Sequence, residues 1–395
     1  MERLASVRVP RIWRDVHLWI ALGLGLLIVP VSLSGALLVF GGDLDRLIDP
    51  ARYAMTGSTV EQAAGVYLRN AELAAPGARA AILRWPANAG SPVTVLLRGG
   101  EGGTQAAPSG RLWMVSIDPP TGQVLGVVDA RGSFVGRIHS LHAELMSPDL
   151  SGRQIVGFAG IGLLVLALTG IWLWWPRNGN LLKAFRWRRG AKLSFNLHHM
   201  LGLWIFAPLA LMGLTGAYLS FPQQARGLIA AFAELAPRPP RQGQGAVLMR
   251  LPAQDPQRVV ELALQSGPGL RPTALSTPTE PDKLWRIQLT GEDDEPRSVL
   301  VDDRSLALTV APRTAPGDVF AAWLRRVHEA QHHGPLWRAI AFVCGLSPAI
   351  FLVTGCMMWL RRRAAKAPQF GLRVTVPPAL QRAAGAPQAQ KTLDA

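Results

Sequence analysis

Four long apolar runs dominate the pattern of hydrophobic and polar residues along the chain. They cover residues 18–40, 155–175, 197–219 and 336–360. A helix needs about 20 apolar residues to cross a bilayer, and none of the four runs carries a charged side chain at its middle. We therefore predict a membrane protein with four membrane-spanning helices and the lipid bilayer as its first partner.

Basic residues gather at one end of each run in a chain of 395 residues with a formal net charge of +15. They are Arg3, Arg8, Arg11 and Arg14, then Arg177, Lys183, Arg186, Arg188, Arg189 and Lys192, then Arg361, Arg362 and Arg363. Because Lys and Arg favour the cytoplasmic side of a membrane, both termini and the short middle loop are expected there. We expect a bacterial inner membrane, with two long segments in the periplasm. The charge lies beside apolar runs and not along one stripe, so no nucleic-acid partner is expected.

The two halves of the chain follow the same plan. His17 and Ser34 are seventeen residues apart, as are His198 and Thr215. We predict an internal duplication and a bundle of four membrane helices with two α+β periplasmic domains. The expected order is a cytoplasmic N-terminus (1–16), a first span (17–40), a first periplasmic domain (41–138), an edge helix with the second span (139–175), a basic cytoplasmic loop (176–195), a third span (196–220), a second periplasmic domain (221–325), an edge helix with the fourth span (326–361) and a cytoplasmic tail expected to be disordered (362–395).

The long outer segments each combine one helical pattern with several short strand patterns. "TVEQAAGVYLRNAELAA" and "QRVVELALQSG" predict amphipathic helices. Residues 118–122, "DPPTG", separate two alternating runs, which predicts a hairpin. The Gly-rich stretch 98–110 is expected to be a mobile loop.

Histidines mark the candidate chemistry. His17 and His198 begin the first and third runs, while five others precede the second and fourth runs: His139, His142, His328, His332 and His333. A neutral imidazole is a common haem ligand, and a b-type haem can take one from each of two helices at the same depth. The chain has no C-x-x-C-H motif for covalent attachment. We therefore predict two haem b groups, one near each face, with His199 turned about 100° away from His198.

Other interpretations of these residues stay open. His139 and His142 are three residues apart and His328 and His332 four, so each pair shares a helical face and could belong to a non-haem metal site. Arginines near the outer histidines could bind haem propionates, an anionic substrate or lipid headgroups; they are Arg137, Arg153, Arg325, Arg326 and Arg338. Each run also carries a small pair that permits close packing of a helix or a flat cofactor: Ser34-Gly35, Thr169-Gly170, Thr215-Gly216 and Thr354-Gly355.

Several motifs together resemble the PepSY-associated transmembrane family, which includes bacterial iron-regulated membrane proteins and ferrisiderophore reductases. The resemblance extends from about Val16 to Arg363 and is carried by "HLWIALGL", "SLHAELM", "LTGIWLWWPR", "FNLHHMLGLW", "HHG" and "TGCMMWLRRR". "VSIDPPTGQVLG" resembles the PepSY strand–turn–strand, whereas "VLVDDRSLALTV" lacks its turn. The outer domains are accordingly expected to be PepSY-like.

The reductase branch of this family implies a di-haem enzyme. Electrons would pass from a cytoplasmic donor, such as a flavoprotein, to a ferric siderophore in the periplasm and release Fe(II). Carried onto this sequence, the inner axial ligands are His17 and His198, and the outer ones are His142 and His332, with His139, His328 and His333 as substitutes. Two alternatives are a non-enzymatic PepSY regulator that binds a peptide or protein, and a metal-chelate transporter.

Overall fold

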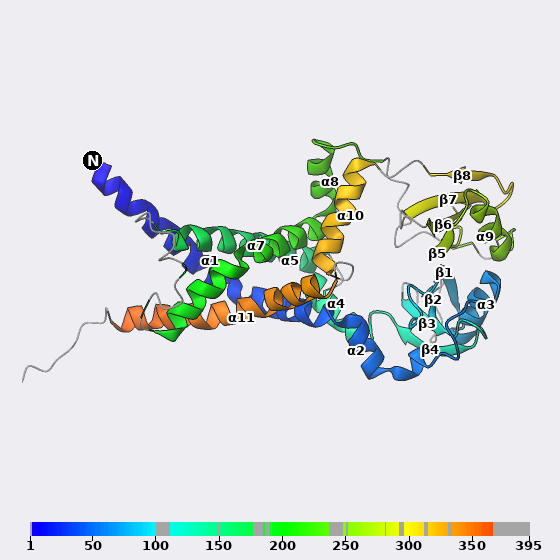
Figure 1. The fold of residues 1–395 in the computed structure, drawn as a ribbon, viewed down its shortest axis with the longest axis horizontal. Coiled ribbons are helices and arrows are strands. Elements are labelled where there is room, and N and C mark those ends of the chain that lie inside the picture. Colours follow the sequence, from blue (N-terminus) through cyan, green and yellow to red (C-terminus); the bar gives the residue numbers. More distant parts are fainter. Residues whose placement is uncertain are drawn as a thin grey trace, which may run out of the picture.

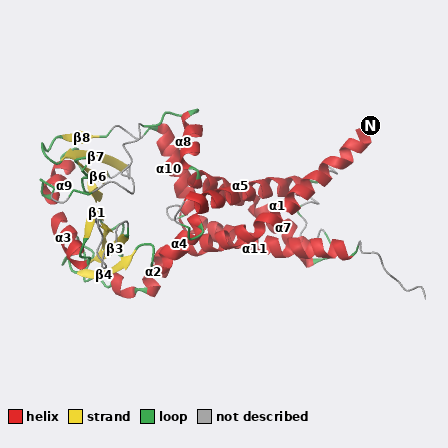
Figure 2. Cartoon of the chain, turned by 180° about the vertical axis from the view of Figure 1, so that it is seen from behind, coloured by secondary structure: helices red, strands yellow, loops and turns green. Residues whose placement is uncertain are grey.

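The four apolar runs form four long helices in a computed structural model. The structure describes residues 2–99, 111–147, 150–176, 185, 190, 192–236, 248–249, 252–280, 282–291, 296–311, 315–330 and 334–365. The long helices are α1 (Glu2–Leu38), α5 (Leu150–Trp174), α7 (Leu193–Ser220) and α11 (Gly334–Ala364). All four are long and apolar enough to cross a membrane, as the sequence predicts. They lie side by side, with a sheet beyond one end of the bundle (Figures 1 and 2). We call this end the sheet side and the opposite end the far side.

Small residues allow the long helices to pack closely. Neighbours around the bundle follow the order α1, α5, α7, α11 and back to α1, so α1 and α7 lie opposite each other. A Cβ added at Gly160 on α5 would lie 3.0 Å from the carbonyl oxygen of Gly213 on α7. One added at Gly345 on α11 would lie 2.8 Å from the carbonyl oxygen of Ser32 on α1. Close packing of this kind stabilises helix association in lipid, where the hydrophobic effect is absent.

Two shorter helices, α4 (Phe134–Glu144) and α10 (Pro316–Glu329), precede the second and fourth spans. Residues 139–175 and 326–361, each expected to hold an edge helix and a span, therefore contain only the last part of α4 or α10. Each helix ends at a residue in the left-handed conformation, Leu145 at φ 52° and Ala330 at φ 56°. This conformation ends a helix and redirects the chain. Helix α10 crosses α7 at a steep angle (Figure 1).

The outer segments form one eight-stranded antiparallel sheet. Its order is β4-β3-β2-β1-β5-β6-β7-β8. The sequence predicts two separate domains, but β1 and β5 pair, with Leu83 opposite Leu275. A strand at a sheet edge exposes unpaired backbone groups, and the pairing of residues 82–84 of β1 with 274–276 of β5 satisfies some of those groups in both halves. The strands are β1 (Ala78–Arg84), β2 (Val93–Gly99), β3 (Leu112–Ile117), β4 (Val124–Asp129), β5 (Arg271–Ser276), β6 (Leu284–Thr290), β7 (Pro296–Asp302) and β8 (Leu308–Val310).

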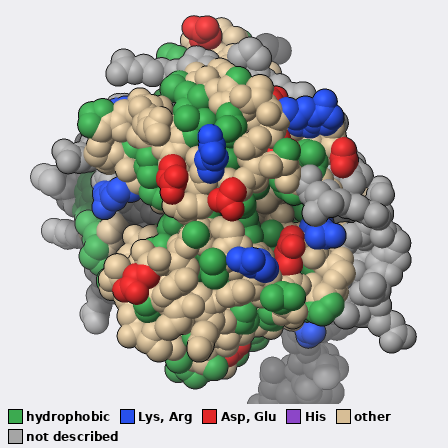
Figure 3. Space-filling model, turned by 90° about the vertical axis from the view of Figure 1, so that its right-hand side faces the viewer, with side chains coloured by type: hydrophobic (Ala, Val, Ile, Leu, Met, Phe, Trp, Pro, Cys, Tyr) green, Lys and Arg blue, Asp and Glu red, His purple; other side chains and the backbone are tan. Residues whose placement is uncertain are grey.

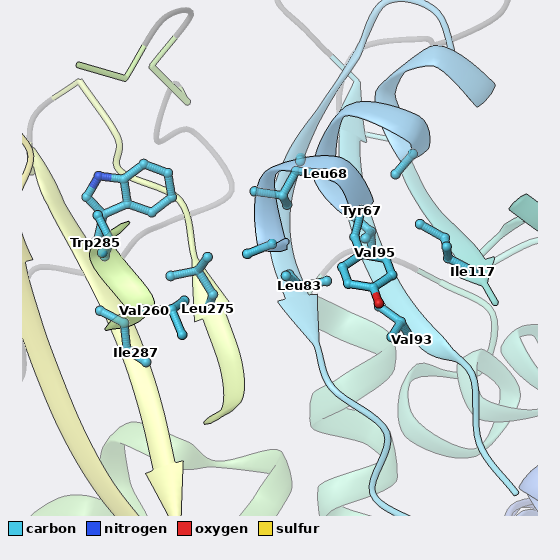
Figure 4. Packing of buried hydrophobic residues seen from close by; sticks show 14 of the residues in the cluster. Tyr67, Leu68, Leu83, Val93, Val95, Ile117, Val260, Leu275, Trp285 and Ile287 are labelled. Atoms are coloured by element: carbon cyan, nitrogen blue, oxygen red, sulfur yellow. The ribbon is translucent and has the colours of Figure 1, made fainter. Parts of the chain in front are cut away.

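One hydrophobic core underlies this sheet. Helices α3 (Ala64–Ala74) and α9 (Pro256–Leu264) contact the sheet and each other. Their buried residues join those of both strand sets in a single cluster, which includes Tyr67, Leu83, Leu275 and Trp285 (Figure 4). The indole Nε1 of Trp285 donates a hydrogen bond of 2.8 Å to Asp303.

The helix and hairpin predictions for the outer segments are confirmed. The two amphipathic patterns contain α3 and α9, and residues 118–122 join β3 to β4 as a hairpin. Gly122 has φ +73°, a conformation that glycine adopts at little cost. Most of the expected mobile loop lies outside the described residues, but Arg98 and Gly99 belong to β2. Most of the expected disordered tail also lies outside them, but residues 362–364 belong to α11. Acidic and basic side chains intermingle on the face in Figure 3.

Two short helices and a 3-10 turn complete the connections on the sheet side. After α1 come α2 (Gly41–Ile48) and η1 (Pro50–Tyr53), and after α7 comes α8 (Pro222–Ala230). Helix α2 contacts α4, and α8 contacts α10. These contacts connect the ends of the first and third spans to the helices that carry the outer histidines.

Candidate functional site

Four histidines meet in two pairs. On the far side, His17 of α1 and His198 of α7 lie across the bundle with ring centroids 6.4 Å apart and ring planes at 78°. On the sheet side, His142 of α4 and His328 of α10 have centroids 6.0 Å apart and planes at 38°. We call these the far-side pair and the sheet-side pair. Each pair takes one histidine from each half of the chain.

A threonine on a neighbouring helix orients three of the four imidazoles. The Nδ1 atoms of His17, His198 and His328 each lie 2.9 Å from a hydroxyl oxygen, those of Thr169, Thr354 and Thr215 respectively. Each hydroxyl donates its own proton to the carbonyl four residues earlier at 2.7 Å. The hydroxyl oxygen therefore accepts a hydrogen bond from Nδ1–H. This tautomer leaves Nε2 unprotonated and able to bind a metal.

His142 reaches the same tautomer through a carbonyl group. Its Nδ1 lies 2.8 Å from the carbonyl oxygen of Val31, an atom that can only accept. Ser34 occupies the position that threonine holds in the other three helices, and its hydroxyl donates to the same carbonyl at 2.7 Å. In all four imidazoles, the Nδ1–H group therefore donates to a defined acceptor.

The glycine after each of these hydroxyl residues makes room for an imidazole. A Cβ at Gly35 would lie 2.7 Å from Cε1 of His142, and one at Gly216 would lie 3.1 Å from Cε1 of His328. Gly170 and Gly355 have the same relation to His17 and His198, at 3.5 and 3.6 Å. The small pairs in the sequence therefore mark the positions against which the four histidine rings pack. In the sequence, the equal spacing of Ser34 from His17 and of Thr215 from His198 indicated these positions. It did not indicate which helix supplies the histidine that packs there.

The two pairs lie near opposite ends of the bundle. On α1, His17 belongs to the far-side pair and Gly35 contacts the sheet-side pair, eighteen residues later. His198 and Gly216 on α7 have the same separation. Eighteen residues of α-helix rise about 27 Å, close to the thickness of about 30 Å of a hydrocarbon core. The pairs are therefore separated by nearly the full depth of a membrane.

Burial keeps the sheet-side imidazoles neutral. It lowers the pKa of His328 to about 3 and lowers the pKa of His142 below its usual value. Both residues lie on helices outside the four long spans. A neutral imidazole is the form that binds a metal.

The separation within each pair fits one metal ion bound from two sides. A metal–imidazole bond is about 2 Å long, so two such nitrogens in line are about 4 Å apart. Adding about 1 Å from each nitrogen to its ring centre gives centroids about 6 Å apart. The observed separations are 6.4 and 6.0 Å. Among the described residues, no group of three or more His, Cys, Asp or Glu side chains could hold a metal ion.

The other candidate histidines fall outside these pairs. His139 is exposed on α4. His199 packs on Phe195 with ring centroids 4.1 Å apart. His332 and His333 lie outside the described residues, so the assignment of His332 as an outer ligand is not tested. The structure brings His328 to His142 instead.

The candidate arginines lie at the sheet side and differ in their contacts. Arg137 donates to the carbonyl of Gly132, and Arg326 is exposed. Arg338 pairs with Asp43 at 2.7 Å. Arg153 and Arg325 line a cavity.

Comparison with known proteins identifies relatives of the chain. A family model described as "PepSY-associated TM region" matches residues 14–362. Over 256 residues the chain is 28% identical to the uncharacterized protein PA4219 of Pseudomonas aeruginosa. The alignment covers 57% of the chain and 63% of that relative's length.

Proposed function

The chain belongs to the PepSY-associated transmembrane family, and from that premise we propose that it is a di-haem b-type oxidoreductase of the bacterial inner membrane. It would pass electrons from a cytoplasmic donor to a ferric siderophore in the periplasm and release Fe(II). The observation that carries this proposal is the presence of two histidine pairs, each at the separation of axial ligands on one iron. Bound haem would supply one-electron redox chemistry at each pair.

The assigned ligands are His17 and His198 on the far side, and His142 and His328 on the sheet side. His328 takes the place that the sequence resemblance gives to His332, because its ring faces His142 and its Nδ1 is held by Thr215. The threonine hydroxyls and the Val31 carbonyl orient the imidazoles and select their tautomer. These partners would thereby present each Nε2 to a bound iron and would increase its basicity.

The sidedness and the duplication belong to the same proposal. Both halves run long helix, short helix, helix, four strands, helix, long helix, which supports an internal duplication. The basic residues beside the far-side ends favour a cytoplasmic far side. The sheet would then lie in the periplasm, with the far-side pair facing the electron donor and the sheet-side pair facing the siderophore.

Haem quantification tests the proposal directly. We expect the purified full chain to contain two haem b per chain in a pyridine hemochrome assay. Its Soret band should shift, and its α and β bands should sharpen, on reduction with dithionite. Adding a ferric siderophore to the reduced protein should restore the oxidised spectrum. A colourless, iron-free preparation would overturn the proposal.

The two haems should differ in their electron paramagnetic resonance. The angle between axial imidazole planes controls the largest g value of low-spin ferric haem, which rises as the planes approach perpendicular. The rings of the far-side pair are at 78° and those of the sheet-side pair at 38°. We expect two low-spin signals, with the larger maximum g from the far side. A single signal for both haems would contradict the difference in geometry.

Removing one threonine hydroxyl should shift the midpoint potential of one haem. Thr169→Val keeps the shape of the side chain but removes the hydroxyl oxygen that lies 2.9 Å from Nδ1 of His17. A less basic imidazole stabilises the ferric state less, so the far-side midpoint potential should rise by roughly tens of millivolts. Potentiometric titration would measure this shift, and Thr169→Ser, which keeps the hydroxyl, should stay near the parent. Unchanged potential and haem content in Thr169→Val would contradict the role of the hydroxyl.

A further inference from the structure

A basic cavity opens at the sheet-side end of the bundle. Its volume is about 120 Å³, and it is enclosed by α5, α7, α8 and α10 together with Leu235. One water molecule needs about 10–15 Å³ of volume measured in this way, so the cavity can hold one carboxylate or phosphate group. Three arginines line it, Arg153, Arg226 and Arg325, and its other lining residues include Leu219 and Ala321.

The charges in this cavity leave a positive excess. Arg226 pairs with Asp318 at 2.9 Å, and Arg325 pairs with Glu329 at 3.3 Å. Arg153 donates to the carbonyl oxygen of Leu219 at 3.2 Å, a neutral acceptor. The Arg325–Glu329 pair is exposed, and exposed ion pairs contribute little stability. An incoming oxyanion can therefore bind Arg153 and Arg325 at small cost.

The cavity lies one helical turn from the sheet-side pair. Arg325 precedes His328 by three residues on α10, and the cavity residue Leu219 follows Thr215 by four on α7. Thr215 is the residue whose hydroxyl holds His328. A group bound in the cavity is therefore next to the proposed outer redox centre.

The cavity lies on the side of α10 opposite its exposed apolar residues. Trp323 is two residues from both Ala321 and Arg325, which places it about 160° around the helix from either. Trp323 is 44% exposed, and Val319 on the same apolar side is 53% exposed. Exposed apolar side chains beside the end of a span favour contact with lipid. The cavity lies on the other side of the helix, where the Arg325 side chain in its wall is exposed.

We propose that this cavity binds a carboxylate arm of an anionic ferric chelate and holds it beside the sheet-side pair. Guanidinium groups recognise carboxylates and phosphates through two parallel hydrogen bonds, and two of the three arginines are free of a buried carboxylate partner. The inference rests on the proposed function for its choice of iron as cargo. It adds a class of substrate, chelates with free carboxylates, and a place where they bind.

Binding of Ga(III)–citrate tests the site without any electron transfer, because Ga(III) resembles Fe(III) but is not reduced. We expect calorimetric titration of the full chain in detergent to show binding. Arg153→Gln and Arg325→Gln should each weaken it about tenfold, the loss of one charge-assisted hydrogen-bond pair. Arg326→Gln is the matched control, since Arg326 is exposed on α10 and does not line the cavity; its affinity should equal that of the parent.

Three results would overturn the site. The first is no binding of Ga(III)–citrate, and the second is equal affinity in Arg153→Gln, Arg325→Gln and the parent. The third is loss of binding in nanodiscs with phosphatidylglycerol but not with phosphatidylcholine alone, which would assign the cavity to a lipid headgroup. Haem measured on the same samples separates the two proposals. Arginine-dependent binding to a chain without haem would refute the redox function and leave the anion site standing.

Discussion

Replacing His17 by alanine is expected to reduce the haem content from two per chain to one. The remaining far-side ligand, His198, would face an empty position, because His199 is packed on Phe195 and turned away. Loss of one of the two imidazoles removes one of the two protein–iron bonds that would hold a non-covalent haem. His198→Ala should give the same loss, measured by pyridine hemochrome on purified protein.

Matched variants make this expectation specific. His199→Ala, one residue from a ligand, should retain both haems. On the sheet side, His328→Ala should lose one haem, while His139→Ala should retain both, because His139 is exposed on α4. His332→Ala decides between the two outer assignments. Loss of haem in His332→Ala but not in His328→Ala would return the outer ligand to His332 and refute the sheet-side pair.

Replacing Trp285 by alanine is expected to destabilise the whole outer sheet by about 3–5 kcal/mol. The indole is 1% exposed in the shared core and donates to Asp303, so the substitution leaves a cavity and removes a partner of a buried carboxylate. Because one cluster joins both halves, the effect should reach β2 in the first half. Amide hydrogen exchange would show loss of protection at Val93 and Val95 as well as at Ile287.

An exposed residue provides the control for this change. Leu73 on α3 is 73% exposed, so Leu73→Ala should change the free energy of unfolding by less than about 0.5 kcal/mol. If Trp285→Ala lowers protection in the second half alone, the two halves fold independently. The sequence-based division into two domains would then describe their stability better than the shared sheet does.

Properties that depend on neighbouring residues were predictable from the sequence. Membrane crossing follows from run length and hydropathy, and the turn at residues 118–122 follows from local backbone preferences. Equal spacing on α1 and α7 placed His17 and His198 at matching positions of their spans. The positions of small pairs such as Thr169-Gly170 were also predictable, because spacing along a helix determines the depth and the face of each residue.

Tertiary structure alone decided which of these features meet. The contact between His142 and Val31 joins residues 111 positions apart, and that between His17 and Thr169 joins residues 152 apart. Spacing along one helix says nothing about which other helix packs beside it, so the choice of His328 as the partner of His142 could not be derived. The pairing of β1 with β5 could not be predicted for the same reason. The sequence pattern of an edge strand is the same whether water or another strand forms its hydrogen bonds.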